Sequence, residues 1–293
     1  MNNSCIDKGT SKCDEWNKVV DEHKSFSDIV TSFAKKTLSI ADFPPSNIQL
    51  QEGQDNKIRI LDVACGMGEV VLVAQELCCP KKFHFIATDF SEEMIRQVGN
   101  CLKKKSINNI ETAVMDAANM STLCSDSFDY VICQFAIDHF YSPQESVNEM
   151  TRLLKPNGTC VIATWKYTDV MTLIEQAADL TVGSDWRENS EGIATSHAHR
   201  FADESKLIQI ANSAGLRNVN VSGVSMKFNV GCLEKSYPVI SRNPIADQIL
   251  SRLDEDGREK FRLNFLKVSQ DKIDSNGNLH LEIHTNIMRA TKF

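Results

Sequence analysis

The stretch IRILDVACGMGEVVLVAQ, from Ile58 to Gln75, decides the fold of this chain. It begins as an apolar run that ends in an acid, passes through Gly66 and Gly68, and continues with helical spacing. Glycines at a strand end let the backbone turn tightly and let a ligand approach without a Cβ in the way. The free amides at the start of the following helix can donate hydrogen bonds to that ligand. The stretch therefore predicts a strand, a glycine turn and a helix that together bind a nucleotide-type ligand.

From Lys57 onward, strand-like and helix-like segments alternate along the chain. We expect strands near 58–63, 83–88, 111–115, 128–134, 158–165, 217–229 and 279–291, and helices near 68–78, 91–104, 143–154 and 203–214. Such alternation favours a parallel sheet with helices on both faces. The pattern predicts an α/β, Rossmann-like fold with seven strands, mostly parallel, and an antiparallel last strand.

Segments that do not fit the alternation flank or interrupt the sheet domain, which we expect over 51–293. Residues 1–50 contain a helical stripe of Phe26, Ile29, Val30 and Phe33, so we expect an N-terminal helical lid segment. Insertions at about 167–200 and 231–273, the latter with helical pattern over 244–273, are expected to form the substrate cap.

Three acids follow three successive strands and identify the type of ligand. A dinucleotide fingerprint needs a third glycine where this chain has Val71, which weakens a dehydrogenase interpretation. Asp62, before the glycines, would repel a pyrophosphate but suits an ammonium group. Asp89 can accept both hydroxyls of a ribose, and Asp116 can accept from an adenine amine. An adenosine joined to a cationic amino acid satisfies this pattern, and S-adenosylmethionine is that ligand.

Apolar and amide side chains near the same strand ends complete the predicted cofactor site. Phe90, Met94 and Ala117 are placed to sandwich an adenine ring. Gln134 and Phe135 end the fourth strand and face the same edge of the sheet.

Five motifs in order make the chain resemble a known family. They are ILDVACGMGEV, FIATDFSEEMI, MDAANM, SDSFDYVICQFAIDHF and EMTRLLKPNGTCVIATW, running from about 58 to 165. The chain resembles the class I S-adenosylmethionine-dependent methyltransferases, in the subgroup of ubiquinone/menaquinone C-methyltransferases and many small-molecule enzymes. It is also similar to fungal secondary-metabolite enzymes, including thiol methyltransferases.

The resemblance implies roles for individual residues. Ala64, Cys65 and Gly66 would contact the methionine moiety through their backbone, with Gly68 in the same turn. The family often has glycine where this chain has Ala64. It further implies that Asp89 contacts the ribose, that Phe90 and Met94 lie against the adenine, that Asp116 and Ala117 lie at the adenine edge, and that Gln134 lies near the amino-acid end. Cys65 as a reactive nucleophile is the alternative to a backbone contact.

The expected activity is methyl transfer from S-adenosylmethionine to a sulfur, nitrogen or oxygen atom of a small molecule. His139, after the fourth strand, is the candidate general base, with pocket lining or packing as its alternative. Phe135 and Trp165 are the candidate walls of the substrate pocket. Two alternatives stay open: a C-methyltransferase of a quinone or lipid-like substrate, and a catalytically silent cofactor-binding partner protein.

The composition of the chain indicates which kinds of binding partner to expect. The net charge of −7, with no dense basic stretch beyond Lys103–Lys105, disfavours a nucleic-acid substrate. The ten cysteines form no CxxC pair, which is typical of reduced thiols in a cytoplasmic protein. We expect no membrane span, because no run of roughly 18 apolar residues occurs. His197 and His199 lack partners at metal-ligand spacing, so no metal site is expected. The oligomeric state stays open.

Overall fold

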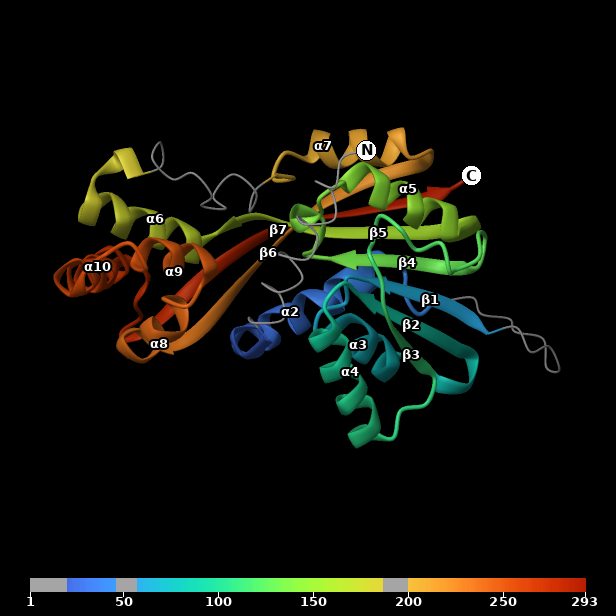
Figure 1. The fold of residues 1–293 in the computed structure, drawn as a ribbon, viewed down its shortest axis with the longest axis horizontal. Helices are drawn as coiled ribbons and strands as arrows, with labels where there is room; N and C mark the ends of the chain where they lie inside the picture. The colour runs from blue at the N-terminus through green and yellow to red at the C-terminus, as the bar shows by residue number, and fades with distance from the viewer. Residues whose placement is uncertain (1–19, 46–56, 187–199) are drawn as a thin grey trace, which may run out of the picture. The chain divides into compact units, whose positions relative to one another are not determined.

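The computed structural model describes residues 20–45, 57–186 and 200–293. Its strands form a seven-stranded sheet in the order β3-β2-β1-β4-β5-β7-β6 (Figure 1). Strands β3, β2, β1, β4 and β5 pair in parallel, and the arrow of β7 points opposite to that of β4. The predicted seven-stranded α/β sheet is thereby confirmed. The strands are β1 (Ile58–Val63), β2 (Phe83–Asp89), β3 (Ile110–Val114), β4 (Phe128–Gln134), β5 (Leu154–Thr168), β6 (Leu216–Cys232) and β7 (Asn278–Lys292).

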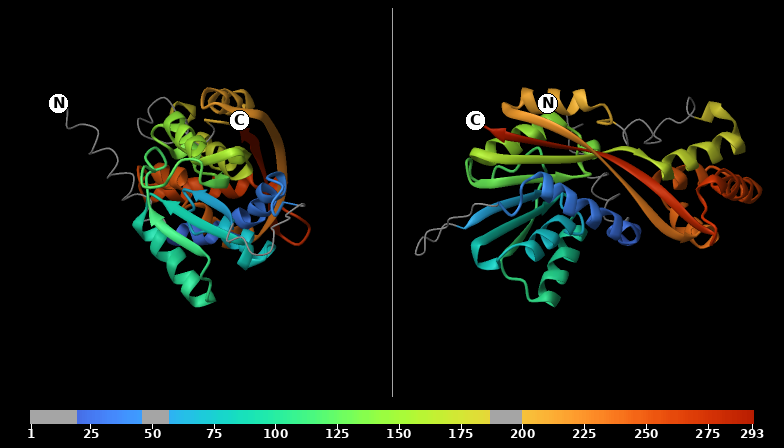
Figure 2. Two further views of the ribbon diagram at one scale, coloured as in Figure 1. Left: turned by 90° about the vertical axis from the view of Figure 1, so that its right-hand side faces the viewer. Right: turned by 180° about the vertical axis from the view of Figure 1, so that it is seen from behind.

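The α-helices are α2 (Val20–Ile40), α3 (Glu69–Leu77), α4 (Glu92–Lys105), α5 (Pro143–Leu153), α6 (Asp169–Val182), α7 (Glu204–Ser213), α8 (Leu233–Ile240), α9 (Pro244–Leu250) and α10 (Glu255–Val268). Short 3₁₀ turns are η1 (Pro80–Lys82), η2 (Ile137–His139), η3 (Ser184–Trp186) and η5 (Gln270–Lys272). Crossovers between parallel strands are right-handed, so β1-α3-β2 and β4-α5-β5, which step in opposite directions, place their helices on opposite faces. Helix α2 packs against α3, and α5 packs against α7; Figure 2 shows α2 beside the central strands.

The strand order reverses between β1 and β4, and this reversal positions the site. In open α/β sheets, ligands bind beyond the carboxyl ends of the strands at such a point. Strands β1 and β4 end at about the same level of the sheet, because Asp62 of β1 is in register with Ile132 of β4. On its other side, Asp62 is in register with Ala87 of β2. Helix α4, after β2, is capped by Ser91, whose hydroxyl accepts from the backbone N–H of Met94 at 3.1 Å.

Two element boundaries differ from the sequence prediction. Strand β5 begins at Leu154, not 158, because Leu154 pairs with Phe128 before a bulge and Thr159 pairs with Tyr130 after it. The helical pattern expected over 244–273 corresponds to two helices, α9 and α10. Asp254 starts the second helix by accepting from the backbone N–H of Gly257 at 2.9 Å.

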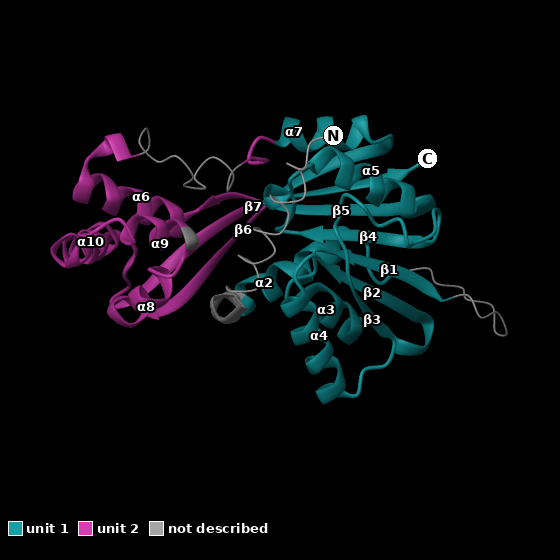
Figure 3. Cartoon of the chain, viewed as in Figure 1, with its two compact units in different colours: residues 1–164, 204–222, 287–293 teal, residues 165–203, 223–286 magenta. Residues whose placement is uncertain are grey.

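The chain divides into two compact units (Figure 3). Unit 1 comprises residues 1–164, 204–222 and 287–293, and unit 2 comprises residues 165–203 and 223–286. Unit 1 contains the carboxyl ends of β1, β2 and β4. Unit 2 has its own core, in which α6 and α10 pack together with apolar side chains of β7.

The expected insertions fall within unit 2: 167–200, of which 187–199 lie outside the described residues, and 231–273. Their role as a substrate cap stays a prediction. Of the expected lid segment 1–50, the structure describes residues 20–45, and the side chain of Phe26 is not among those described. Ile29 and Phe33 are buried on α2. No helix in the described ranges has the length and apolarity needed to cross a membrane.

Candidate functional site

The glycine turn lies between β1 and α3. Ala64, Gly66 and Gly68 have φ values of 54°, 54° and 81°, in the left-handed region that favours glycine. Ala64 adopts this conformation despite its Cβ, at a cost of roughly 1–2 kcal/mol. The turn is held in place because the backbone N–H of Cys65 donates to the carbonyl of Thr88, and that of Gly68 to the carbonyl of Cys65, each at 2.8 Å. A Cβ on Gly68 would lie 3.2 Å from a side-chain carbon of α4.

Asp62 is a buried carboxyl at the end of β1. It is 1% exposed, and its Oδ2 has no hydrogen-bond partner among the described residues. Burial, and then the charges of Glu69 and Asp89, raise the pKa of Asp62 well above its usual value, while a hydrogen bond from the backbone of Val71 opposes them. A buried oxygen without a donor indicates a ligand that carries positive charge or N–H groups.

Asp89, at the end of β2, shapes the turn. Its Oδ2 accepts from the backbone N–H of Gly66 at 2.9 Å, and its Oδ1 accepts from the backbone N–H of Ser91 at 2.8 Å. A carboxylate has about four acceptor positions and can accept from several donors at once. Asp89 therefore fixes the turn and is oriented by it.

Glu69 belongs to this acidic group but was not singled out from the sequence. It is 5% exposed, at the first position of α3, and its Oε1 accepts from the hydroxyl of Ser27 on α2 at 3.1 Å. Its charge contributes to the raised pKa of Asp62. The sequence did contain a signal for Glu69: it directly follows Gly68, and the residue at that position begins the helix beside the end of β1.

Asp116 lies in the loop after β3, next to the end of β2. The two are adjacent because the backbone N–H of Met115 donates to the carbonyl of Asp89 at 2.9 Å. Asp116 is exposed, and its Oδ1 accepts from the backbone N–H of Ala118 at 2.9 Å. Ala117 is buried in the same loop. On the neighbouring β2–α4 connection, Phe90 is half-buried, and on α4 Met94 is buried.

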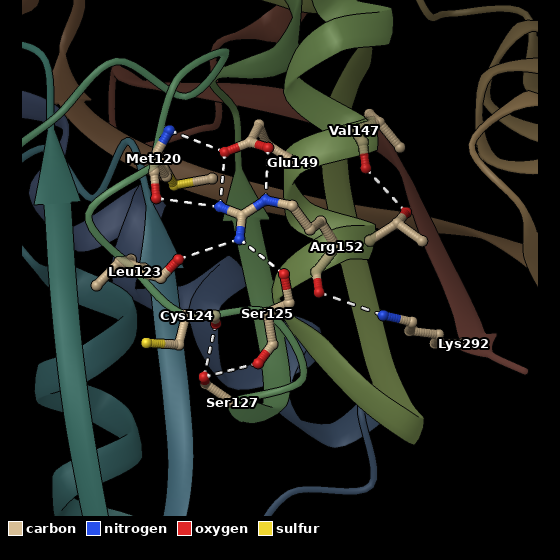
Figure 4. A network of polar contacts seen from close by, with 10 residues as sticks. Met120, Leu123, Cys124, Ser125, Ser127, Val147, Glu149, Arg152 and Lys292 are labelled. Carbon is tan, nitrogen blue, oxygen red and sulfur yellow. Dashed lines mark hydrogen bonds and ion pairs between the residues drawn. The ribbon is translucent and has the colours of Figure 1, made fainter.

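An ion pair on α5 supports the Asp116 loop (Figure 4). Arg152 and Glu149 are joined at 2.7 Å. The Arg152 guanidinium donates to the carbonyls of Met120 and Leu123 at 3.1 and 3.0 Å, while Glu149 accepts from the backbone N–H of Met120 at 2.9 Å. The hydrogen bond from Arg152 is the main cause that lowers the pKa of Glu149. This network anchors the far end of the loop that begins at Asp116.

Gln134, at the end of β4, is engaged by α2. Its Oε1 accepts from the hydroxyl of Thr37 at 2.7 Å, and its Nε2 donates to the carbonyl of Val30 at 3.1 Å. Phe135, with φ of 58°, contacts Phe33 edge-to-face at 5.5 Å between ring centroids. The side-chain amide of Gln134 has two N–H groups, and one of them donates to Val30. The expected contact with the amino-acid end of the cofactor would use the other.

His139 lies at the end of η2 and is half-buried. Its neighbour Asp138 is 2% exposed, and its carboxylate accepts a hydrogen bond from the hydroxyl of Thr164 on β5. The hydrogen bond between Thr164 and Asp138 therefore fixes η2 to strand β5. Trp165, the other candidate pocket residue, is half-buried and begins unit 2.

Cys65 is a buried thiol, and its surroundings oppose ionisation. Burial, followed by the charges of Asp62, Asp89 and Glu69, raises its pKa well above the usual value. A thiol without thiolate character is a poor nucleophile, which favours a backbone contact. In the described part of the chain, no group of three or more His, Cys, Asp or Glu side chains is arranged to hold a metal ion. His197 and His199 lie outside the described residues.

These residues fit S-adenosylmethionine. Asp62 supplies a buried acceptor that a cationic amino-acid group would satisfy. The turn at Gly66 and Gly68 brings backbone close to a ligand without side-chain obstruction. Asp89 is in register with Val114 at the end of the adjacent strand β3, and Asp116 follows two residues later, so the two acids can take the two halves of an adenosine. A pyrophosphate fits poorly beside this concentration of carboxylates.

Comparisons with known proteins agree with this arrangement. The family model described as a methyltransferase domain matches residues 54–215. The methyltransferase tpcH of Aspergillus fumigatus is 25% identical over 204 residues, which cover 69% of this chain and 72% of tpcH. The demethylmenaquinone methyltransferase of Staphylococcus carnosus is 26% identical over 235 residues, which cover 73% of this chain and 93% of that protein.

A solved structure shows the same fold. It is phosphoethanolamine N-methyltransferase 2 of Haemonchus contortus, in complex with phosphomonomethylethanolamine and S-adenosylhomocysteine. The alignment has a TM-score of 0.50 at 17% identity and covers 88% of this chain and 52% of that chain. The resemblance drawn from the five motifs is confirmed by these matches.

Proposed function

This chain belongs to the S-adenosylmethionine-dependent methyltransferases, and from that premise we propose that it methylates a small molecule at a sulfur, nitrogen or oxygen atom. The choice of acceptor atom depends on which side chains the turn after β4 can present to a substrate. Asp138 is buried there and holds Thr164, so its carboxylate is not presented to a substrate. His139 is the titratable side chain that this turn offers. A nucleophile that needs little help from a base, such as a thiolate or an amine, suits this arrangement best.

The proposed mechanism relies on positioning. When bound, S-adenosylmethionine supplies a methyl carbon that is already electrophilic because it is attached to a sulfonium. Asp62 would hold the cationic amino-acid end, Asp89 the ribose, and Asp116 with Ala117 the adenine edge. Orientation of two reactants accounts for about 7–11 kcal/mol of a barrier when the geometry is well aligned. For an oxygen nucleophile, His139 would accept the proton that leaves the acceptor.

A small molecule is favoured over a nucleic acid by charge and by the relatives. The chain has a formal net charge of −7, which opposes contact with a phosphate backbone. The Staphylococcus carnosus and Haemonchus contortus proteins are named for demethylmenaquinone and phosphoethanolamine, both small molecules. The first of these names also supports a second candidate, a carbon acceptor of the quinone type, for which a base such as His139 would be essential.

The test is incubation of the protein with methyl-labelled S-adenosylmethionine and fractionated metabolite extracts, with the labelled product identified by mass spectrometry. We expect label on sulfur, nitrogen or oxygen of a small molecule. Label on a ring carbon would replace this proposal with the quinone-type candidate. Cofactor binding without any labelled product, from extract or nucleic acid, would indicate a silent partner protein.

A further inference from the structure

We propose that Glu69 is a positioning residue that couples the positive charge of the bound cofactor to the docking of α2, through the hydroxyl of Ser27. The inference rests on the proposed cofactor site, and it adds to that site the carboxylate of Glu69, which the sequence did not single out, and its contact with α2. It begins from the hydrogen bond between Ser27 Oγ and Glu69 Oε1 at 3.1 Å, which joins residues 42 positions apart.

The first step concerns the charge near Glu69. Its carboxylate and that of Asp89 both act electrostatically on Asp62, which is 1% exposed. The Oδ2 of Asp62 has no hydrogen-bond partner in the described part of the chain. Such an oxygen, buried beside two further carboxylates, is unfavourable alone and is satisfied by a cation with N–H donors. The ammonium end of the cofactor has this chemistry.

The second step concerns the effect of that cation on α2. The carboxylates of Glu69 and Asp89 act unfavourably on a charge at Asp62, because like charges at close range repel one another. A cation with N–H donors beside Asp62 offsets this repulsion and holds Glu69 beside the end of β1, where its Oε1 accepts from Ser27. Binding of the cation therefore holds the Ser27 end of α2 against the start of α3.

The third step shows that α2 has other attachments, so that the coupling can be tested without losing the helix. Thr37 donates to Gln134 at 2.7 Å, and Phe33 contacts Phe135 edge-to-face. These contacts involve no carboxylate. Loss of the Ser27 hydroxyl should therefore release the Ser27 end of α2 and leave the Thr37 end docked.

The experiment measures hydrogen–deuterium exchange of the α2 segment 27–33 in the full chain with three ligands. S-adenosylmethionine and S-adenosylhomocysteine carry the ammonium group, and 5′-methylthioadenosine lacks it. We expect the first two to slow exchange by about 5–150-fold, the usual range of coupling between sites, and the third to leave exchange unchanged. Ser27→Ala should abolish the slowing. Ser32→Ala is the matched control, because Ser32 donates to the carbonyl of Asp28 on its own helix.

A charge-specific variant gives the second readout. Glu69→Gln keeps an oxygen that accepts from Ser27 but removes the charge. We expect it to weaken S-adenosylmethionine binding by about 5–150-fold and to leave methylthioadenosine binding unchanged. Equal loss for both ligands, or wild-type slowing of exchange in Ser27→Ala, would overturn the coupling while the cofactor site stands. Absence of S-adenosylmethionine binding to the wild-type chain would overturn the cofactor site and the coupling together.

Discussion

Asp89 Oδ2 accepts a hydrogen bond from the backbone N–H of Gly66 at 2.9 Å, so the end of β2 holds the glycine turn that follows β1. Its other oxygen accepts from the backbone N–H of Ser91 at the start of the next helix. One side chain thus ties the end of β2 to the turn that follows the adjacent strand β1. A residue of this kind has both a structural and a ligand-binding role, and the two are separable by experiment.

Asp89→Ala is expected to weaken S-adenosylmethionine binding by about 1–3 kcal/mol, because a carboxylate that accepts ribose hydroxyls is lost. Titration calorimetry measures this, and urea denaturation should show a parallel loss of about 1 kcal/mol from the missing Gly66 hydrogen bond. Glu111→Ala, an exposed acid on neighbouring β3, is the charge-matched control. Wild-type cofactor affinity in Asp89→Ala would remove the proposed ribose contact.

Asp62→Asn should stabilise the ligand-free protein at neutral pH while it weakens cofactor binding. The folded-state pKa of Asp62 is raised, chiefly by burial, so the folded chain holds a proton that the unfolded chain releases above about pH 4. The resulting destabilisation is absent below the unfolded pKa and grows as the pH rises toward the folded pKa.

The measurement for Asp62→Asn is the thermal unfolding midpoint from pH 4 to pH 8, with cofactor affinity in parallel. The unfolding midpoint of the variant should rise relative to that of the wild type as the pH rises. Its free energy of cofactor binding should become less favourable by about 1–3 kcal/mol. A stability difference that does not change with pH would contradict the assignment of a buried, protonated carboxyl.

Arg152→Ala should destabilise the protein by about 2–3 kcal/mol, because several hydrogen bonds to a charged group are lost at once. Arg96→Ala is the control, since Arg96 forms an exposed pair with Glu93 three residues away, and such solvent-exposed pairs add little to stability. Urea denaturation measures both. Because the Asp116 loop also loses its anchor (Figure 4), cofactor affinity should fall in Arg152→Ala and not in Arg96→Ala.

His139→Ala distinguishes the acceptor classes. If the acceptor is an alcohol or a carbon acid, turnover should fall by roughly 10²–10⁴-fold, the usual contribution of a general base. If the acceptor is a thiol or an amine, as we favour, turnover should stay within a few-fold of the wild type. The assay follows labelled product at saturating cofactor, and His139→Gln controls for the volume of the ring.

Most of the fold followed from local patterns in the sequence. Alternating apolar residues predicted β1 through β4, since the burial of a strand is recorded in its own residues. The predicted start of β5, at 158, was too late. Residues 155–158 (KPNG) have the composition of a turn, but β5 pairs with β4 on both sides of them. The sequence predicted helix over 244–273, and the cap at Asp254 starts the second of the two helices that lie there.

The candidate site divides in the same way. Asp62, Gly66, Gly68, Asp89 and Asp116 could be singled out from the sequence because each follows a strand, and parallel strands bring their carboxyl ends to one edge. The contacts between Ser27 and Glu69, Thr37 and Gln134, and Thr164 and Asp138 could not, because the partners are 42, 97 and 26 residues apart. Local periodicity and turn chemistry therefore determined the sheet and the ligand class. Only the packing of α2, α5 and β5 against the strand ends decided which side chains are held, because a hydrogen bond depends on distances that sequence spacing does not encode.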